Sequence, residues 1–166
     1  MAEISVPELS LVVLVGVSGS GKSTFAARHF KPTQVISSDY CRGLVADDEN
    51  DQTATPDAFA LLNHIVGVRL RRGLLTVVDA TNVQRHARAE LVKLAKDHHV
   101  LVDAIVLDVD PKLAAERNEA RPDRDFGEQV IRRQHRDLKR SLKGLKKEGF
   151  RRVHRLSGLG EVESAV

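Results

Sequence analysis

The stretch GVSGSGKS, residues 16–23, restricts the possible folds of this 166-residue chain more than any other feature. It matches the pattern G-x-x-x-x-G-K-[ST] at every fixed position. The apolar run LSLVVLV (9–15) lies directly before it, and the helical pattern STFAARHF (23–30) follows it. A chance turn rich in glycine and serine would need neither neighbour. The arrangement therefore predicts a phosphate-binding loop between a buried strand and a helix.

The predicted loop holds anions mainly with its backbone. Glycines let the chain fold closely around a phosphate chain, and successive N–H groups and the helix N-terminus point at the anion. Lys22 is expected to reach the β- and γ-phosphates, and the Ser23 hydroxyl to bind Mg²⁺. We therefore expect the protein to bind ATP or another nucleoside triphosphate (NTP) with Mg²⁺ or Mn²⁺. The loop residues predicted to bind the nucleotide are Gly16, Ser18, Gly19, Ser20, Gly21, Lys22, Ser23 and Thr24.

Short apolar runs alternate along the chain with longer helical patterns, which predicts an α/β fold with a central parallel sheet of about five strands flanked by helices. The chain is expected to form a single domain (1–166), with a core over about 9–156 and a frayed tail over 157–166. Ligands of such sheets bind at the carboxyl ends of the strands. The expected strands are 9–15, 33–37, 74–80, 100–109 and 150–156. The expected helices are 23–30, 56–72 with Thr55 as N-cap, 84–99, 110–120 and 128–149.

Asp79 ends the third expected strand, in VVDATN, so its carboxylate should lie near the phosphate loop. Magnesium sites beside such loops use an aspartate, directly or through water. The alternative role is to cap the helix that follows, but Thr81 or Asn82 is better spaced for that. The position at a strand end therefore predicts a metal-binding role for Asp79, shared with Ser23.

Asp39 lies just past the second expected strand and faces the same crevice as the phosphate loop. A kinase that phosphorylates a hydroxyl needs a carboxylate to orient the hydroxyl and accept its proton. Arg42 shares a helix face with Asp39 if a short helix starts near Tyr40, and a guanidinium suits a phosphate on the acceptor. The alternative is an Asp–Arg ion pair on the surface, which contributes little. The joint interpretation is an acceptor with a phosphate next to its reacting hydroxyl.

The stretch ERNEARPDRDFG is predicted to form a lid that carries arginines. Arg117 and Arg121 are four residues apart, on one face near the end of a helix, and Arg124 follows in a polar loop. Mobile arginines can offset the charge that develops on the γ-phosphate as water is excluded. The alternative is favourable placement of cations at a helix C-terminus. We expect Arg117 and Arg121 to bind the nucleotide and to take part in catalysis.

Charge is unevenly distributed along the chain. Residues 112–155 contain 15 Lys or Arg and 7 Asp or Glu, whereas residues 39–57 contain 1 Arg and 6 acids. The basic third could attract a polyanion, or it could be an ordinary solvated helix face. Aromatic residues make up only 4% of the chain, which argues against base stacking on several aromatic platforms.

The chain has one cysteine, Cys41, and no stretch typical of a signal peptide or a membrane span. We therefore expect a cytoplasmic protein that does not bind membranes. Cys41 is expected to be a small buried residue, because phosphoryl transfer needs no thiol. The histidines show no metal-ligand spacing with cysteine, and the following are expected at the surface or in caps: His64, His86, His98, His99, His135 and His154.

Several stretches together resemble the 5′-hydroxyl polynucleotide kinase module of bacterial polynucleotide kinase–phosphatase RNA repair proteins. The resemblance spans about residues 11–156. Its more specific part is the combination of D-x-x-R after the second strand with R-x-x-x-R-P in the lid. The stretches that carry it are GVSGSGKSTF, ISSDYCRGLV, DDENDQTAT, VVDATNVQ, RNEARPDRDFG and RRQHRDLKRSL.

The resemblance implies an adenylate-kinase-like P-loop fold and transfer of the γ-phosphate of ATP to the 5′-OH end of RNA or DNA. It implies that Asp39 is the general base and that Arg42 contacts the phosphate next to the attacking nucleoside. Full-length members of the family continue into phosphatase and adenylyltransferase modules, which do not fit in this chain, so only kinase activity is expected. The family also self-associates, which implies a homodimer that no residue pattern establishes here.

Two other functions remain open at this point. A small-metabolite kinase of the gluconate or shikimate type would share the phosphate loop, the lid and the parallel sheet. A nucleotide-binding switch without enzymatic activity would share the loop, but it would have no base aimed at an acceptor hydroxyl. The Asp39–Arg42 pair and the basic C-terminal third favour a phosphorylated, extended acceptor over both.

Overall fold

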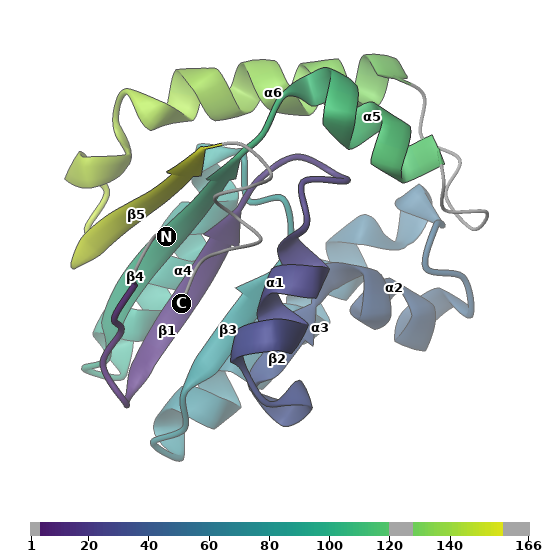
Figure 1. The fold of residues 1–166 in the computed structure, drawn as a ribbon. Helices are drawn as coiled ribbons and strands as arrows, with labels where there is room; N and C mark the ends of the chain where they lie inside the picture. Colours follow the sequence, from purple (N-terminus) through teal and green to yellow (C-terminus); the bar gives the residue numbers. More distant parts are fainter. Residues whose placement is uncertain (1–3, 120–127, 158–166) are drawn as a thin grey trace.

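The computed structural model describes residues 4–119 and 128–157 and shows a sheet of five strands (Figure 1). The strand order is β2-β3-β1-β4-β5, and every pairing is parallel. The predicted α/β class and central parallel sheet are therefore confirmed. The strands are β1 Ser10–Val15, β2 Val35–Ser37, β3 Thr76–Asp79, β4 Leu101–Asp108 and β5 Arg152–Ser157.

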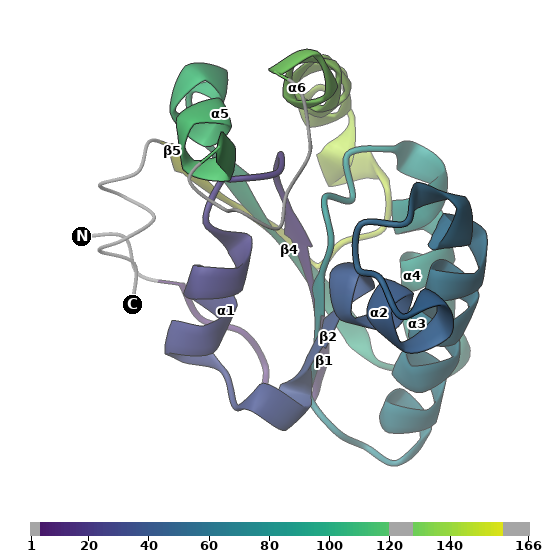
Figure 2. The same ribbon diagram turned by 90° about the vertical axis from the view of Figure 1, so that its right-hand side faces the viewer.

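Helices cover both faces of the sheet. Figure 2 shows α1 on one face and α2, α3 and α4 on the other, while α5 and α6 lie beyond the carboxyl ends of the strands. The α-helices are α1 Lys22–His29, α2 Ser38–Ala46, α3 Thr55–Arg71, α4 Arg85–Asp97, α5 Pro111–Glu119 and α6 Glu128–Leu142. The 3₁₀ turns are η1 Pro32–Gln34, η2 Gln52–Ala54 and η3 Leu145–Lys147. None of the helices in the described part of the chain is long and apolar enough to cross a membrane.

The central position of strand β1 explains the unbroken apolar run over residues 11–15. Residues 11–15 are fully buried, because helices cover both faces of the sheet and leave no solvated side on which polar residues could alternate. Ile4 and Val6, before β1, also pack against this core, so the core starts earlier than the predicted residue 9. At the other end, Ser157 still belongs to β5, and the rest of the predicted tail lies outside the described residues.

Several predicted boundaries differ from the structure, and at three of them a 3₁₀ turn lies in or beside the expected element. The expected strand 33–37 is a 3₁₀ turn followed by only three strand residues, 35–37. Thr55 is the first residue of α3 and not its N-cap, because the turn η2 runs straight into the helix and Asp51 caps that turn by accepting from Thr53 N. The basic helix expected over 128–149 ends at Leu142, since the chain turns there to bury Leu145 before entering β5.

The register of the sheet brings the strand ends that matter to one edge. Ser37, the last residue of β2, pairs with Asp79, the last residue of β3, and Val13 of β1 pairs with Val78 of β3. Residues that follow β1, β2 and β3 therefore enter the same crevice. This is the position that the strand-end rule predicts for a ligand.

Candidate active site

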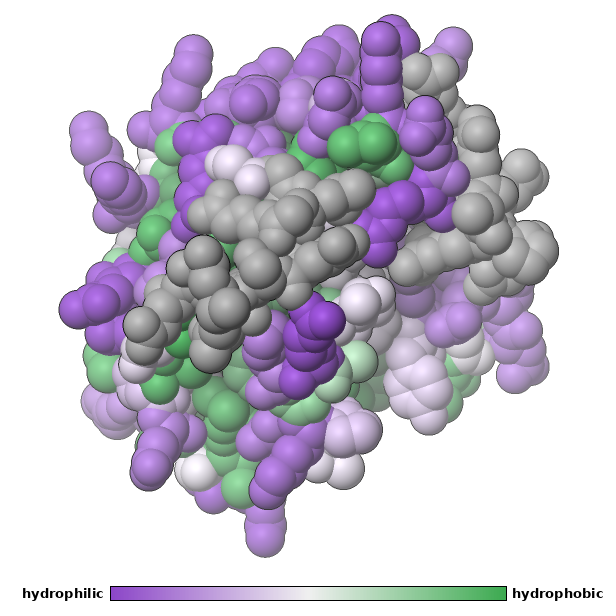
Figure 3. Space-filling view, in the orientation of Figure 1, coloured by the Kyte–Doolittle hydropathy of each residue, from purple (hydrophilic) through white to green (hydrophobic). Residues whose placement is uncertain are grey.

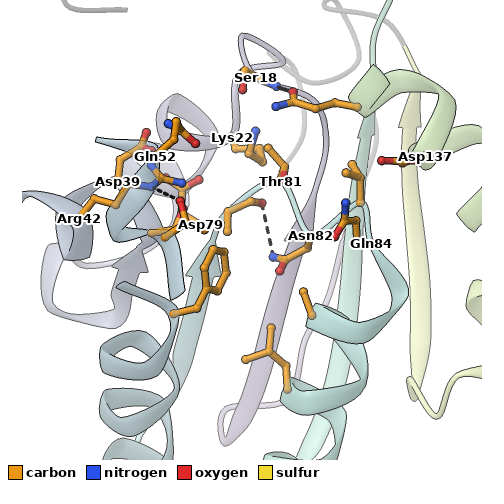
Figure 4. A pocket seen from close by; sticks show the side chains of 18 of the residues that line it. Ser18, Lys22, Asp39, Arg42, Gln52, Asp79, Thr81, Asn82, Gln84 and Asp137 are labelled. Atoms are coloured by element: carbon orange, nitrogen blue, oxygen red, sulfur yellow. Dashed lines mark hydrogen bonds and ion pairs between the residues drawn. The ribbon is translucent and has the colours of Figure 1, made fainter. Parts of the chain in front are cut away.

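A cavity of about 790 Å³ opens at the carboxyl ends of β1, β2 and β3 (Figure 4). The phosphate loop and Asp79 form one part of its wall, and side chains of α2, η2, α3, α4 and α6 form the rest. Figure 4 shows Lys22, Asp39, Arg42 and Asp79 around one end of the cavity and Asp137 of α6 on the opposite side. The cavity therefore joins the predicted donor residues to the predicted acceptor residues.

The loop conformation requires glycine at Gly19. Its φ is +82°, and a Cβ atom added there would lie 2.2 Å from the carbonyl oxygen of Ala114 in α5. A side chain at this position is thus excluded both by backbone conformation and by a neighbouring helix. Gly21 also has a positive φ, of 98°, directly before α1 begins at Lys22. The backbone N–H groups at the start of α1 consequently face the loop, as phosphate binding needs.

Not all predicted loop residues face the cavity. Gly16, Ser20 and Thr24 are not among its lining residues, and the Ser20 hydroxyl is buried without a hydrogen-bond partner among the described residues. Gly16 instead donates its N–H to the Thr81 carbonyl oxygen at 3.0 Å, which attaches the loop to the chain after β3. The predicted loop residues that line the cavity are Ser18, Gly19, Gly21, Lys22 and Ser23.

Ser23 and Asp79 come together as the sequence predicted. Ser23 Oγ donates to Asp79 Oδ2 at 2.7 Å, although the two residues are 56 positions apart. A hydroxyl and a carboxylate fit Mg²⁺, which commonly uses one or two protein oxygens and fills its other positions with phosphate oxygens and water. In the described part of the chain, no group of three or more His, Cys, Asp or Glu residues could hold a metal ion. A metal here would therefore depend on the nucleotide phosphates for several of its ligands.

Asp39 and Arg42 form an ion pair inside the cavity. Ser37 Oγ accepts from Tyr40 N and caps α2, so that Asp39 and Arg42 lie one turn apart on the same helix face. Arg42 Nη1 donates to Asp39 Oδ1 at 2.5 Å, with side-chain exposures of 9% for the arginine and 26% for the aspartate. These exposures do not fit the alternative of a surface ion pair.

Two further contacts hold the Arg42 guanidinium in place. Its Nε donates to Thr55 Oγ1 and its Nη1 to the Glu49 carbonyl oxygen, both at 3.3 Å. Burial lowers the pKa of Arg42, while Glu49 and Cys41 act in the opposite direction. An arginine titrates far above neutral pH, so the guanidinium stays charged. The stretch 47–55 thus supplies part of the scaffold that orients Arg42.

Arg117 lies on a helix that packs against the phosphate loop. Ala114 of α5 approaches Gly19, and Arg117 is one turn further along the same face. The Arg117 side chain is partly buried but is not among the residues that line the cavity. Arg121 and Arg124 lie outside the described residues, so the predicted pairing of Arg117 with Arg121 stays a prediction.

Gln134 is a site residue that the sequence did not indicate. Its Oε1 accepts the Ser18 N–H at 2.8 Å, from a position 116 residues further along the chain. The stretch around it, RRQHRDLKRSL, is positively charged and is one of those that carry the family resemblance, but neither property assigns a role to Gln134. No local signal marks a glutamine in a basic helix as a contact of the phosphate loop, because the contact depends on where α6 lies.

Arg88 is a second residue whose role the sequence did not indicate, because it is a charged side chain buried in the protein. It is 1% exposed, and it pairs through Nε and Nη2 with both Glu148 carboxylate oxygens at 2.7 Å. Its Nη1 also donates to the Asn82 carbonyl oxygen at 3.0 Å and to Ser141 Oγ at 2.9 Å. This buried cluster connects α4, the segment after β3 and the end of α6. Because Arg88 does not line the cavity, we assign the cluster a structural role in positioning these elements around it.

The prediction for one histidine was wrong. His154, expected at the surface or in a cap, has a side chain that is only 14% exposed, and its Nε2 lies 3.2 Å from Asp103 Oδ2. Asp103 is fully buried and also accepts two hydrogen bonds from Arg151, at 2.7 and 2.8 Å. The parallel pairing of β4 with β5 brings these residues together, which the sequence could not indicate.

Cys41 lies beside the site but is not equipped as a nucleophile. It is 1% exposed, as expected of a small buried residue. Burial raises the pKa of its thiol, and the neighbouring Arg42 guanidinium only partly opposes this. The thiol, which is far less nucleophilic than a thiolate, is therefore the form present near neutral pH.

Comparison with known proteins places the chain in a family. The sequence model of a family described as "AAA domain" matches residues 11–145. No curated protein matches the sequence significantly. The matched segment contains the phosphate loop, Asp79, Asp39, Arg42 and α6, so it includes the whole cavity wall.

Similar folds occur among solved structures of kinases and of an RNA repair complex. A chain of the Pnkp1/Rnl/Hen1 RNA repair complex has a TM-score of 0.69 at 22% identity, over 84% of this chain and 47% of that one. A gluconokinase from Sinorhizobium meliloti 1021 has a TM-score of 0.55 at 20% identity, over 92% and 84%. The APS kinase CysC of Mycobacterium tuberculosis, with AMPPNP and APS, has a TM-score of 0.54 at 25% identity, over 68% and 70%.

These likenesses establish a P-loop kinase fold. The present chain spans about half the length of the repair-complex chain, at 47%. The three structures are of an RNA repair complex, a gluconokinase and an APS kinase, so the shared fold does not select one substrate.

Proposed function

The chain belongs to the AAA domain family, and from that premise we propose that it is a polynucleotide 5′-hydroxyl kinase. It transfers the γ-phosphate of ATP or another NTP to the 5′-OH end of RNA or DNA, a reaction that heals broken strands. The observation that carries the proposal is the Asp39–Arg42 pair, which lines the same cavity as the phosphate loop and is held there by Thr55 and Glu49.

The donor occupies the phosphate loop. Backbone N–H groups of the loop and the Lys22 ammonium bind its phosphates. Lys22 is 8% exposed, and its Nζ now donates to the Val17 carbonyl oxygen at 2.9 Å, so the charge already lies within the loop. Ser23 and Asp79 would hold Mg²⁺ or Mn²⁺, which when bound neutralises charge on the β- and γ-phosphates.

Asp39 is the general base. The 5′-hydroxyl oxygen forms a bond to the γ-phosphorus, the bond between that phosphorus and the β–γ bridging oxygen breaks, and the hydroxyl proton passes to an Asp39 carboxylate oxygen. The ion pair with Arg42 orients this carboxylate before the acceptor arrives. Arg42 binds the phosphate that follows the reacting nucleoside, since a guanidinium matches phosphate oxygens in geometry and charge.

The helix α5 supplies positive charge from the other side of the loop. Arg117, one turn beyond the contact between Ala114 and Gly19, acts on the γ-phosphate together with Arg121 of the lid. Their charges offset the negative charge that the transferring phosphoryl group develops on its oxygens. Both arginines act on the nucleotide and not on the acceptor.

The outward face of α6 favours an extended anionic acceptor. Figure 3 shows hydrophilic side chains gathered along the upper margin of the molecule, where α6 lies. A groove of about 570 Å³ runs along this helix and is lined by Pro111, Gln129, Arg132, Arg133, His135 and Arg136. Arg133 lines both this groove and the main cavity, so a strand that passes from the cavity into the groove would meet Arg133 and then Arg132 and Arg136.

A small-metabolite kinase is the second candidate, because a gluconokinase and an APS kinase share the fold. Its acceptor would fit within the cavity and would make no use of the basic groove. The two candidates therefore differ in how the rate depends on acceptor length and on salt. For single strands, the logarithm of the binding constant falls with the logarithm of the salt concentration, with a slope of about −0.7 for each phosphate contacted.

The test is a transfer assay with Mg²⁺ and γ-labelled ATP. The acceptors are a 5′-OH dinucleotide, a longer 5′-OH oligonucleotide, gluconate and APS, each with the wild type, Arg42→Ala and Arg71→Ala. Arg71 is exposed in the last turn of α3 and does not line the cavity, which makes it a matched control.

We expect label on both oligonucleotides and a KM for them about tenfold higher or more in Arg42→Ala, as for loss of a charge-assisted contact, with Arg71→Ala unchanged. The longer oligonucleotide should have the lower KM and the steeper salt dependence. Label on gluconate or APS without label on either oligonucleotide would overturn the proposed function.

A further inference from the structure

The contact between Gln134 and the phosphate loop connects α6 to the donor site. Gln134 Oε1 accepts the Ser18 N–H at 2.8 Å, from the middle of α6. Ser18 and Gln134 are both lining residues of the main cavity, and Figure 4 shows Ser18 at the outer end of the loop, near Lys22. The contact is thus made where the loop receives phosphate.

The Val17–Ser18 peptide unit lies between Lys22 and Gln134, two side chains that carry N–H donors for a phosphate. Its carbonyl oxygen accepts from Lys22 Nζ at 2.9 Å, and its N–H donates to Gln134. The amide oxygen of Gln134 thus accepts the hydrogen bond that the Ser18 N–H could otherwise donate to a phosphate oxygen. Because Oε1 is the acceptor, the two N–H donors of Nε2 remain on the other branch of the amide. A glutamine can therefore satisfy the loop without phosphate and donate to a phosphate when one is present.

The same side of α6 lines the part of the cavity away from the loop. Val130 and Asp137 lie three or four residues from both Arg133 and Gln134, so the four share one face of the helix. Opposite them, α3 and α4 contribute Asn63 and Glu90, which are joined by a hydrogen bond of 2.8 Å. We call this face of α6 its acceptor-facing side. Because Gln134 belongs to it, the contact between Gln134 and Ser18 fixes the position of this face relative to the phosphate loop.

We propose that Gln134 is a positioning residue that reads whether the terminal phosphate of the donor is present and places the acceptor-facing side of α6 accordingly. A triphosphate takes the Ser18 N–H, and Gln134 donates through Nε2 to a terminal phosphate oxygen. A diphosphate lacks that oxygen and leaves Gln134 on Ser18. The acceptor therefore meets its complete binding surface only when a transferable phosphate is in place. This inference rests on the proposed kinase function, and it is independent of which acceptor is used.

The test compares dissociation constants of a non-hydrolysable triphosphate and of the diphosphate, with Mg²⁺ and without acceptor. Gln134→Glu keeps the shape of the side chain but places a negative charge against the terminal phosphate. Arg140→Gln changes the charge of the same helix by the same one unit, at an exposed residue that lines neither the main cavity nor the groove. Gln134→Ala removes the amide without adding charge, and thermal unfolding shows that each variant is folded.

We expect Gln134→Glu to lower the preference for triphosphate over diphosphate by about tenfold or more, because like charges brought together are strongly disfavoured. Gln134→Ala should lower the same ratio less, and Arg140→Gln should leave it unchanged. A purely structural role would weaken both nucleotides alike and leave the ratio constant. An unchanged ratio in Gln134→Glu would overturn the inference.

A second measurement uses the acceptor that the wild type phosphorylates. Its affinity should be higher in the presence of the triphosphate analogue than with the diphosphate, and Gln134→Ala should remove this difference. A difference retained in Gln134→Ala would overturn the coupling. The ratio of the two nucleotide dissociation constants is measured without acceptor. The result for Gln134 can therefore be interpreted even if the transfer assay contradicts the polynucleotide proposal.

Discussion

The two ends of the cavity are built in different ways. At the proposed donor end, eight consecutive residues form the phosphate loop, in which Gly19 and Gly21 have positive φ and the backbone is the expected phosphate ligand. At the acceptor end, Asp39 and Arg42 of α2 depend on Thr55 of α3 and on the Glu49 carbonyl oxygen for their orientation. The site proposed for the donor is thus encoded locally, whereas the site proposed for the acceptor depends on how several elements pack.

This difference agrees with the finding that proteins named for different activities share the fold. The gluconokinase and the APS kinase resemble the chain over 92% and 68% of its length. A loop that binds through its backbone changes little when other residues change. An acceptor site made of side chains from separate elements can be altered by one or two substitutions. The predictions below separate the two ends experimentally.

The largest effect is expected at the acceptor end. Asp39→Asn keeps the shape of the side chain but removes the proton acceptor, so kcat should fall by about 10²–10⁴-fold. The dissociation constant of ATP should stay within a factor of about two, because the donor end is unchanged. Single-turnover transfer and nucleotide titration measure the two quantities. Asp57→Asn, at an exposed acid of α3 outside the cavity, is the control. A variant Asp39→Asn that keeps most of its kcat would show that Asp39 is not the base.

At the donor end we expect a smaller effect, on ATP affinity and not on kcat. Gly19→Ala places a Cβ against the Ala114 carbonyl oxygen in a residue with φ of +82°, so the loop or α5 must move. We expect ATP affinity to fall by about 10–100-fold, in line with about 1–3 kcal/mol of backbone strain. Gly73→Ala is the control, since its φ is +73° but nothing lies within 4 Å of the added atom. Equal losses of ATP affinity in both variants would mean that the contact with α5 does not matter.

The smallest effect concerns the helix that carries the donor loop. His29, at the end of α1, has a buried Nε2 and a ring centroid 4.7 Å from that of Phe25. Burial, and to a lesser extent Arg28, lowers its pKa below the ordinary value of 6.5. The unfolded chain therefore binds the proton more readily, so this histidine contributes stability above pH 6.5 that is lost as the pH falls below it.

Unfolding midpoints between pH 7.5 and 5.5 (about the range over which a histidine titrates) check this sign. His29→Phe should show a smaller loss of stability on acidification than the wild type. His64→Phe, at an exposed position of α3, should behave as the wild type does. Identical slopes for the wild type and His29→Phe would contradict the assignment. This change should leave Asp39 and Arg42 unaffected, since they belong to the acceptor end.

Much of the fold could be predicted because its signals are local. Unbroken apolar runs separated by helical patterns indicated a parallel sheet, and the five strands lie close to where they were expected. The boundaries that were wrong, at Thr55 and Leu142, are places where one element runs into another or turns to bury a side chain. Such boundaries depend on neighbours in space, which a pattern along the chain does not contain.

By itself the sequence determined the phosphate loop and the edge of the sheet at which chemistry can occur. The reason is that loop geometry follows from glycine positions, and the carboxyl ends of parallel strands meet at one edge. Only the tertiary structure decided that Gln134 reaches the loop from 116 residues away and that Arg88 is buried against Glu148. Those contacts depend on the placement of α6 and of the segment after it. Residues far apart in sequence meet only through the packing of whole elements, which no short stretch of sequence specifies.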